Sequence, residues 1–419
     1  MEQRNFKQFF HDTSLIFSPL KVQERVKDRK EGRRWRLFHA TDFQSLMYPC
    51  FIFCRVLGIF PYRINASSYE ISKSCKILWT VIMSVVCLCT LVTIYVINHF
   101  RWFEATSLRR SIDLYVFYIF SGFIAVATYI WDGPRMRLLQ TILKISSELP
   151  LETYRKQCML IHAKDIIGFL FLFLQGSISL VYMEYPVLLK MFSIYITMLV
   201  LQIDMLYMNC ICVLKACFER INDSLANLLA MNNKPHLFRY NYQEKKNFFL
   251  MMKLKALEKQ HLLVNDAVQM LNIVFSLHLV ATIITTFVRI TFFLYYCIIL
   301  WQDIFNFQLT SSQKLFYYIF FIASMMFYLM KIALVVWACE TGKDQAIKIG
   351  ITIHDVLNSI NDKQIQDELK LFSLQILHTT RRNTFCAKGL TMGAPLFTAV
   401  SHSFTFINLI YIACDFAFS

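Results

Sequence analysis

The sequence predicts an all-α polytopic membrane protein with seven transmembrane helices. Hydrophobic residues make up 56% of its 419 residues and only 17% are charged, whereas soluble domains average about 25% charged residues. Several apolar runs reach the ~20 residues that a helix needs to cross a bilayer. With 10 glycines and 8 prolines, the chain has few turn-forming residues for a transmembrane β-barrel. A bundle of membrane-spanning helices is therefore the predicted fold class.

Residues 1–76 are predicted to form a cytosolic N-terminal region. The first forty are polar and basic, without the apolar core and small-residue cleavage site of a signal peptide. The apolar segment 46–62 is short and contains Arg55 and Pro61. Because a short length and an internal arginine both disfavour a span, we expect this segment to be re-entrant or interfacial.

Seven other apolar segments are long enough to span the membrane. We place them at residues 77–99, 112–132, 165–183, 187–211, 272–298, 314–338 and 391–416. The first six form a predicted bundle over residues 77–338. The seventh belongs to a last segment, residues 391–419.

Two cytosolic regions are predicted to be helical. The fourth and fifth spans should continue as helices within residues 212–271, because apolar residues keep helical spacing up to about residue 231 and again from about residue 245. Helices of about 45 residues would be ~65 Å long, about twice the hydrocarbon thickness. These extensions and the region 339–390 should pack together below the membrane as an anchor.

The distribution of Lys and Arg predicts the orientation of the chain. With the N-terminus inside, the predicted cytosolic segments contain 36 of the 43 Lys and Arg residues, and the predicted outer loops contain 4. This bias follows the positive-inside rule. An odd number of spans then places the C-terminus outside, which is the reverse of a G-protein-coupled receptor.

The sequence contains no motif typical of an enzyme, a metal site or a cofactor site. It has no His-Glu-x-x-His, no Gly-rich phosphate loop, no nucleophile elbow and no paired carboxylates within a span. The formal charge of +15 is explained by the cytosolic excess of Lys and Arg. We therefore expect no catalysis, metal, cofactor or nucleic-acid partner, and a lipid bilayer as the surroundings.

Three stretches resemble the insect gustatory and odorant receptor superfamily. The sharpest is residues 367–397, DELKLFSLQILHTTRRNTFCAKGLTMGAPLF, which come after Glu340. Its family-like positions are Phe372, Gln375, His378, Phe385, Ala387 and Gly389. Residues 46–64, LMYPCFIFCRVLGIFPYRI, are similar to the opening apolar segment of gustatory receptors, and residues 266–296, DAVQMLNIVFSLHLVATIITTFVRITFFLYY, to their fifth span.

The resemblance implies a gustatory receptor, that is, a tastant-gated, non-selective cation channel subunit in the plasma membrane of a sensory neuron. It also implies a homo- or hetero-tetramer of identical or related subunits, with a central pore lined by the last span and a ligand pocket in the outer half of the bundle. One departure is that gustatory receptors usually end in Thr-Tyr, five apolar residues and Gln-Phe, where this chain has Phe406, Ile407 and Ala413.

Besides a gustatory receptor, two other functions remain open. A G-protein-coupled receptor is less favoured. An odorant receptor of the same superfamily would share the architecture. A secondary transporter would be expected to show an internal repeat and spans broken by Gly or Pro, and the sequence shows neither.

Arg289 lies in the outer third of the fifth span, at the depth where the family's ligand pocket would lie. The expected pocket residues are Tyr115, Tyr118, Tyr182, Tyr195, Arg289, Thr291, Tyr295, Tyr296, Tyr317 and Tyr318. Aromatic and hydroxyl-bearing side chains suit a small amphipathic ligand. The alternative is that the tyrosines anchor helices at the membrane interface and that Arg289 extends outward to water.

Asp204 and Lys331 share a predicted depth in the inner leaflet. Each lies five residues cytosolic of its span's midpoint, or ~7 Å at 1.5 Å per residue. Because an ionisable group inside a bilayer costs ~2.5–3.5 kcal/mol on insertion scales, we expect the two residues to form an ion pair. The alternative is that Lys331 extends to the inner headgroups and Asp204 meets water inside the bundle.

The last span carries a polar stripe on one helix face. Its members, spaced three or four residues apart, are Thr398, Ser401, Thr405, Asn408, Ile412 and Asp415. Four copies would place a ring of Asp415 at the outer mouth of a pore, above a constriction formed by Ile412, and cation channels use such elements for selectivity and gating. The alternative is that the hydroxyl groups bond to neighbouring helices.

Overall fold

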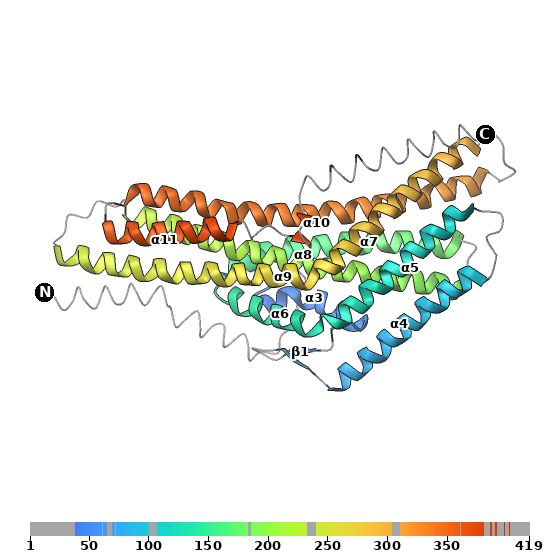
Figure 1. Cartoon of the computed structure of the whole chain (residues 1–419), viewed down its shortest axis with the longest axis horizontal. Coiled ribbons are helices and arrows are strands. Elements are labelled where there is room, and N and C mark those ends of the chain that lie inside the picture. The colour runs from blue at the N-terminus through green and yellow to red at the C-terminus, as the bar shows by residue number, and fades with distance from the viewer. Residues whose placement is uncertain are drawn as a thin grey trace.

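The computed structural model is a long bundle of helices (Figure 1). It describes residues 38–60, 62–64, 69–71, 73–99, 107–182, 186–232, 240–303, 311–360, 362–380, 386–387, 390–391, 398 and 402. Within these residues, six helices are long and apolar enough to cross a membrane. They are α4 (Lys73–His99), α5 (Ser107–Ile130), α7 (Leu151–Tyr182), α8 (Val187–Asn232), α9 (Tyr240–Asp303) and α10 (Ser311–Ser359).

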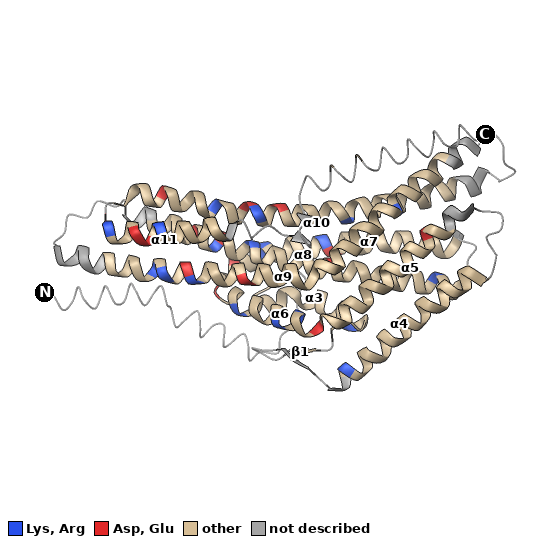
Figure 2. Cartoon of the chain, viewed as in Figure 1, with Lys and Arg blue, Asp and Glu red and all other residues tan. Residues whose placement is uncertain are grey.

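These six helices correspond to the first six predicted spans, and the all-α membrane fold is confirmed. The seventh predicted span, residues 391–416, lies outside the described residues except for Thr391, Thr398 and His402. Figure 2 shows that charged residues gather on the half of the bundle that carries α11 (Lys363–Thr380), whereas the other half is mostly uncharged. The uncharged half is the part that suits a hydrocarbon environment.

Several helix ends differ from the predicted span ends. The second spanning helix ends at Ile130 instead of residue 132, because the chain turns at Trp131 and begins the short helix α6 (Asp132–Ser146). Pro134 lies in the first turn of α6, where no backbone N–H is needed for a helical hydrogen bond. Helices α7 and α10 extend well beyond their spans on the cytosolic side, so α10 runs without a break across the predicted boundary at residue 338.

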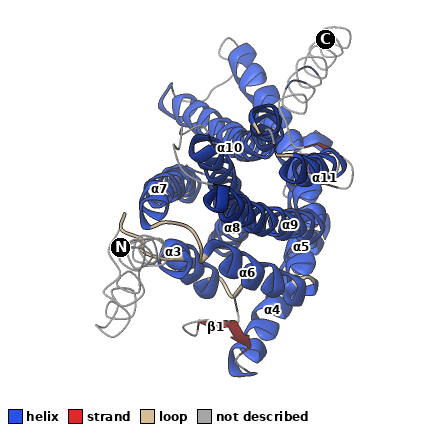
Figure 3. Cartoon of the chain, turned by 90° about the vertical axis from the view of Figure 1, so that its left-hand side faces the viewer, coloured by secondary structure: helices blue, strands red, loops and turns tan. Residues whose placement is uncertain are grey.

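Helix α8 forms the centre of the bundle. It packs against α10, α9, α7 and α3, and the end-on view in Figure 3 shows it with neighbours on several sides. In its apolar window 89% of residues are buried, compared with 28% for α4, which packs mainly on α5. Helix α4 is therefore a peripheral helix of the bundle, whereas substitutions in α8 affect the core.

The half of the bundle predicted to be cytosolic combines the ends of α8, α9 and α10 with α11 (Figure 1). Asp362 caps α11 by accepting hydrogen bonds from the backbone N–H groups of Gln364 (2.9 Å) and Ile365 (3.2 Å). On the inner face of α11, Phe372 is fully buried. The opposite face exposes Leu371, Leu374 and Leu377, which are 58%, 62% and 72% exposed. One apolar stripe thus lies uncovered in the single chain.

The predicted re-entrant or interfacial segment contains helix α3 (Phe43–Val56), which begins at an Asp42 and Ser45 capping box. Its 14 residues are too few to cross a bilayer, as predicted. Two short antiparallel strands follow it, β1 (Tyr62–Ile64) and β2 (Tyr69–Ile71). A second small pair after α11 consists of β3 (Cys386–Ala387) and β4 (Leu390–Thr391).

Candidate functional site

A buried ion pair lies in the outer half of the bundle. Arg289 on α9 donates a hydrogen bond from Nη1 to Oδ2 of Asp113 on α5 at 2.9 Å. The two residues are only 9% and 4% exposed. The guanidinium lies 4.1 Å from the ring centre of Phe117 and 5.6 Å from that of Phe293, so cation–π attraction adds to the ion pair. Arg289 therefore turns into the bundle instead of extending outward to water.

Sequence reasoning missed Asp113, the partner of Arg289. Asp113 stands one residue from the outer end of its predicted span, whereas Arg289 stands nine residues from the outer end of its own. Depth along the spans therefore does not pair them. The usable signal is only that a buried arginine needs a partner of opposite charge.

Aromatic residues of α9 and α10 pack beside this ion pair. The rings of Tyr296 and Phe321 stack with centres 5.4 Å apart, and Tyr317 lies 6.4 Å from Phe321. Phe293, which touches Arg289, lies 6.0 Å from both Phe321 and Tyr328. The structure thus brings five of the predicted pocket residues, Tyr118, Arg289, Tyr295, Tyr296 and Tyr317, into one connected cluster, because Tyr118 lies 5.0 Å from Phe117 and Tyr295 lies 5.7 Å from Tyr296.

Tyr118 and Tyr195 also connect α8 to its neighbours. Tyr118 is buried and stacks on Phe192 of α8 at 6.0 Å. Tyr195 donates a hydrogen bond to the backbone oxygen of Leu57, just beyond the end of α3, at 3.0 Å. This hydroxyl therefore holds α3 against α8 instead of facing the Arg289 cluster.

The rest of the predicted pocket set is placed as follows. Thr291 is buried and donates to the backbone oxygen of Phe287 within α9 at 2.9 Å. Tyr295 is buried next to Tyr296, with ring centres 5.7 Å apart. Tyr115 and Tyr318 are half-buried, and the side chain of Tyr182 lies outside the described residues.

A second charged cluster lies deeper, where α8, α9 and α10 meet. Asp204 is fully buried, and its Oδ2 lies 2.7 Å from Nζ of Lys331. Its Oδ1 lies 2.7 Å from Nε2 of His278 and accepts a longer hydrogen bond from Thr282 at 3.4 Å. The predicted pair is therefore present in the structure as part of a larger cluster that joins three helices.

His278 and Thr282 were not singled out in the sequence. They lie four residues apart on α9 and so share one face of that helix. Two hydrogen-bonding side chains at this spacing in an otherwise apolar run are a usable signal, because each buried polar group needs a partner. What the run does not show is which neighbouring helix supplies the carboxylate.

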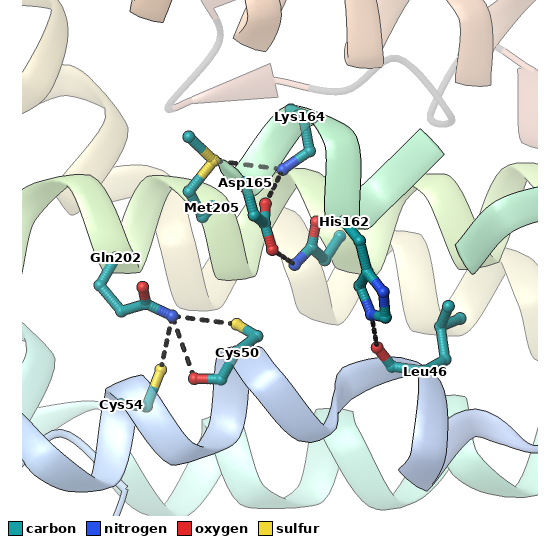
Figure 4. A network of polar contacts seen from close by, with 9 residues as sticks. Leu46, Cys50, Cys54, His162, Lys164, Asp165, Gln202 and Met205 are labelled. Carbon is teal, nitrogen blue, oxygen red and sulfur yellow. Dashed lines mark hydrogen bonds and ion pairs between the residues drawn. The ribbon is translucent and has the colours of Figure 1, made fainter. Parts of the chain in front are cut away.

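Polar contacts also hold α3 and α7 against α8 (Figure 4). Gln202 of α8 donates to the backbone oxygen of Cys50 at 3.0 Å, and His162 of α7 lies 3.1 Å from the backbone oxygen of Leu46. Asp165 pairs with Lys164 and accepts a hydrogen bond from Asn209 at 3.2 Å. These contacts join α3, α7 and α8 to one another.

The junction of α5 and α6 contains another buried polar cluster. Tyr62 donates to the backbone oxygen of Asp132 at 2.8 Å, and Arg135 donates to the backbone oxygen of Ile59 and to the Asp132 carboxylate, each at 3.2 Å. Burial raises the pKa of Asp132, although the neighbouring Arg135 favours its charged form. The cluster ties the segment after α3 to the bend between α5 and α6.

Most of the predicted pore stripe lies outside the described residues. Thr398 is helical and exposed. Ser401, Thr405, Asn408, Ile412 and Asp415 are not among the described residues. The pore stripe therefore stays a prediction.

Comparison with known proteins identifies a family and a fold. A family model described as 7tm Chemosensory receptor matches residues 47–391, whereas no curated protein matches the chain. Two solved structures of the insect olfactory receptor OR5 from Machilis hrabei, one alone and one in complex with eugenol, are similar with a TM-score of 0.66 and 10% identity. Each similarity covers 88% of this chain and 97% or 98% of the receptor.

The structural likeness, at this low identity, concerns the fold. The family match extends from α3 to β4 and includes all six described spans. This chain therefore belongs to the 7tm chemosensory receptor family, and its predicted place in the insect gustatory and odorant receptor superfamily is confirmed.

Proposed function

We propose that this multi-pass membrane protein is a gustatory receptor, acting as a tastant-gated, non-selective cation channel subunit in the plasma membrane. The observation that carries the proposal is the buried Arg289 and Asp113 pair with its aromatic surroundings in the outer half of the bundle. Burying an ion pair inside a membrane helix bundle is costly, because both charges lose their contacts with water. Buried charged residues in such a bundle are therefore candidates for a functional site. In a chemosensory receptor, ligand recognition is the purpose that fits best.

The chemistry of this cluster suits a small amphipathic ligand. Arg289 offers several N–H donors in a fixed plane, and Phe117 and Phe293 offer ring faces. A ligand with an oxygen acceptor and an apolar body would share or replace the contact between Arg289 and Asp113. Such an exchange would alter how α5 packs against α9, which gives ligand binding a structural consequence.

Helices α9 and α10 provide a route from this site to the cytosolic half. Arg289 and His278 lie eleven residues apart on α9, or ~16 Å along the axis, and His278 shares Asp204 with Lys331 of α10. Both helices then continue into the anchor formed with α11. We propose that ligand-induced shifts travel along these continuous helices to the last span, residues 391–419, and open a pore there.

The uncovered apolar stripe on α11 supports assembly of several subunits, for which the family resemblance implies a tetramer. Leu371, Leu374 and Leu377 are exposed on a segment that the orientation rule places in the cytosol. Three large apolar side chains in a row on an aqueous surface indicate an interface. Identical or related subunits are the proposed partners.

An odorant receptor is the second candidate, and one observation favours it. The two similar solved structures are of an olfactory receptor, and one contains the small phenolic compound eugenol. The buried aromatic cluster of α9 and α10 would accept such an apolar compound as readily as a tastant. The two functions differ in ligand chemistry, not in architecture.

Whole-cell recording from cells that express the full chain tests the proposal. A tastant panel and a panel of volatile phenols would be applied with a GTP analogue in the pipette. We expect currents that start without G-protein turnover, and we expect Arg289→Gln to raise the half-maximal agonist concentration. Arg137→Gln, at an exposed position on α6, is the matched control. Unchanged agonist sensitivity in Arg289→Gln channels would remove this site from ligand recognition.

A further inference from the structure

An open groove lies between α8 and α10 in the cytosolic half of the bundle. Its volume is about 330 Å³, and it is lined by Lys215 of α8 together with Thr341, Asp344, Gln345, Ile347 and Lys348 of α10. The groove is separate from both charged clusters described above. Its lining contains two lysines, one aspartate and two uncharged polar side chains.

The upper part of the groove lies at the depth of the inner lipid headgroups, and its lower end extends into the cytosol. Lys215 follows the predicted end of the fourth span by four residues, or ~6 Å along the axis. The α10 lining residues begin with Thr341, three residues after the predicted end of the sixth span, or ~5 Å below the hydrocarbon, and end with Lys348, ten residues after it, or ~15 Å below. The headgroup layer occupies roughly the next 5–8 Å. A lipid in the inner leaflet can therefore reach the groove without leaving the membrane.

Trp337 marks the same level on α10. Its side chain is 37% exposed, and its ring centre lies 6.0 Å from Nζ of Lys215. Tryptophan is enriched where hydrocarbon meets headgroups. A Trp beside Lys215 at this level is an arrangement that suits acyl chains above and a charged headgroup below.

The charges that line the groove form a specific pattern. Lys343, which does not line it, pairs with Glu340 at 3.6 Å. Lys215 lies 3.9 Å from Glu219, a distance that leaves only a weak contact. The lining thus presents positive charge at Lys215 and Lys348 and negative charge at Asp344.

We propose that this groove binds the headgroup of an inner-leaflet phosphatidylserine. That headgroup carries an anionic phosphate, an anionic carboxylate and a cationic ammonium, the complement of two lysines and one aspartate. Lys215, nearer the membrane, contacts the phosphate, and Lys348 contacts the carboxylate. Asp344 accepts hydrogen bonds from the ammonium group.

Thr341 is also placed to contact the ammonium group of the phosphatidylserine headgroup. Its Oγ1 already donates a hydrogen bond to the backbone oxygen of Ala338 at 3.2 Å, so the hydroxyl oxygen remains able to accept one from the ammonium. A lipid bound here bridges α8 and α10, the two helices that Asp204 and Lys331 join closer to the membrane centre. Because the ligand binds the folded chain, it should stabilise the bundle.

Purified full-length protein in mild detergent provides the test. Phosphatidylserine, phosphatidylglycerol and phosphatidylcholine would be added separately, with melting temperature and lipid retention in native mass spectrometry as readouts. We expect phosphatidylserine to be retained best. Lys348→Gln should weaken its binding roughly tenfold, because a charge-assisted contact is lost. Asp344→Asn should remove the preference over phosphatidylglycerol, which has no ammonium group.

The controls test whether lipid retention depends on the groove and whether the bound headgroup belongs to a membrane lipid. Lys370→Gln removes an exposed lysine on α11 and should leave lipid retention unchanged. Soluble glycerophosphoserine should bind far more weakly than the lipid. Equal binding of the soluble headgroup would overturn a membrane source, and equal retention of all three lipids would overturn recognition of the headgroup. Weaker phosphatidylserine retention in Lys348→Gln, with loss of the preference over phosphatidylglycerol in Asp344→Asn and neither change in Lys370→Gln, would establish the site.

Discussion

Replacing Lys331 with methionine should destabilise the bundle strongly. Methionine keeps a similar length without the charge, so Asp204 stays fully buried without its nearest cation. At the observed 2.7 Å, two charges attract by ~6 kcal/mol for an effective dielectric constant of about 20. Desolvation offsets part of this, and loss of one partner of a buried pair costs ~3–5 kcal/mol.

His278 should moderate the effect of Lys331→Met. Its Nε2 remains 2.7 Å from the Asp204 carboxylate, so we expect a loss near ~3 kcal/mol, at the lower end of the range. The double variant Asp204→Leu with Lys331→Met removes both charges. It should be more stable than the sum of the single effects predicts, by ~1–3 kcal/mol.

Unfolding of the purified protein in mixed micelles, followed by tryptophan fluorescence, measures these differences. Lys370→Met is the matched control, because Lys370 and Asp367 form a pair at 3.1 Å whose side chains are 57% and 58% exposed. An exposed pair contributes at most ~1 kcal/mol. If Lys331→Met is no less stable than this control, or if the double variant shows full additivity, the Asp204 cluster does not hold the three helices together.

Four further predictions test other parts of the molecule. Asp113→Asn should lower surface expression and shift agonist sensitivity, because it leaves a buried guanidinium without its carboxylate, and surface labelling with dose–response recording measures both. Leu374→Lys should yield monomers in native mass measurement if the exposed stripe of α11 is the subunit interface; an unchanged oligomer would place the interface elsewhere. An epitope after Ser419 should be accessible on intact cells and one at the N-terminus inaccessible, and the reverse pattern would refute the predicted orientation. Ile412→Ala channels should leak without ligand and Asp415→Asn channels should lose calcium relative to sodium permeability; unaltered recordings from both would show that this stripe does not line the pore.

Local features of the sequence determined the helices and their depths. A span is a run of apolar residues, so hydropathy alone located α4, α5, α7, α8, α9 and α10, and the helical spacing in the following segments indicated that α8 and α9 continue below the membrane. The predicted ends of the helices were less accurate than their locations. Where a helix leaves the lipid its residues become more polar, but the helical backbone continues. The break at Trp131 and the full length of α10 were visible only in the structure.

The depth of a residue is set by its position along a span, but its partner depends on which helix faces meet. Depth alone was enough to suggest Asp204 and Lys331. The other partners, Asp113 for Arg289 and His278 for Asp204, come from helix packing, since they are separated by 176 and 74 positions in the chain. Tyr195 illustrates the same limit, because its hydroxyl lies against the end of α3. The rotation of each helix about its axis is decided by packing against all of its neighbours at once, and only the tertiary structure contains that information.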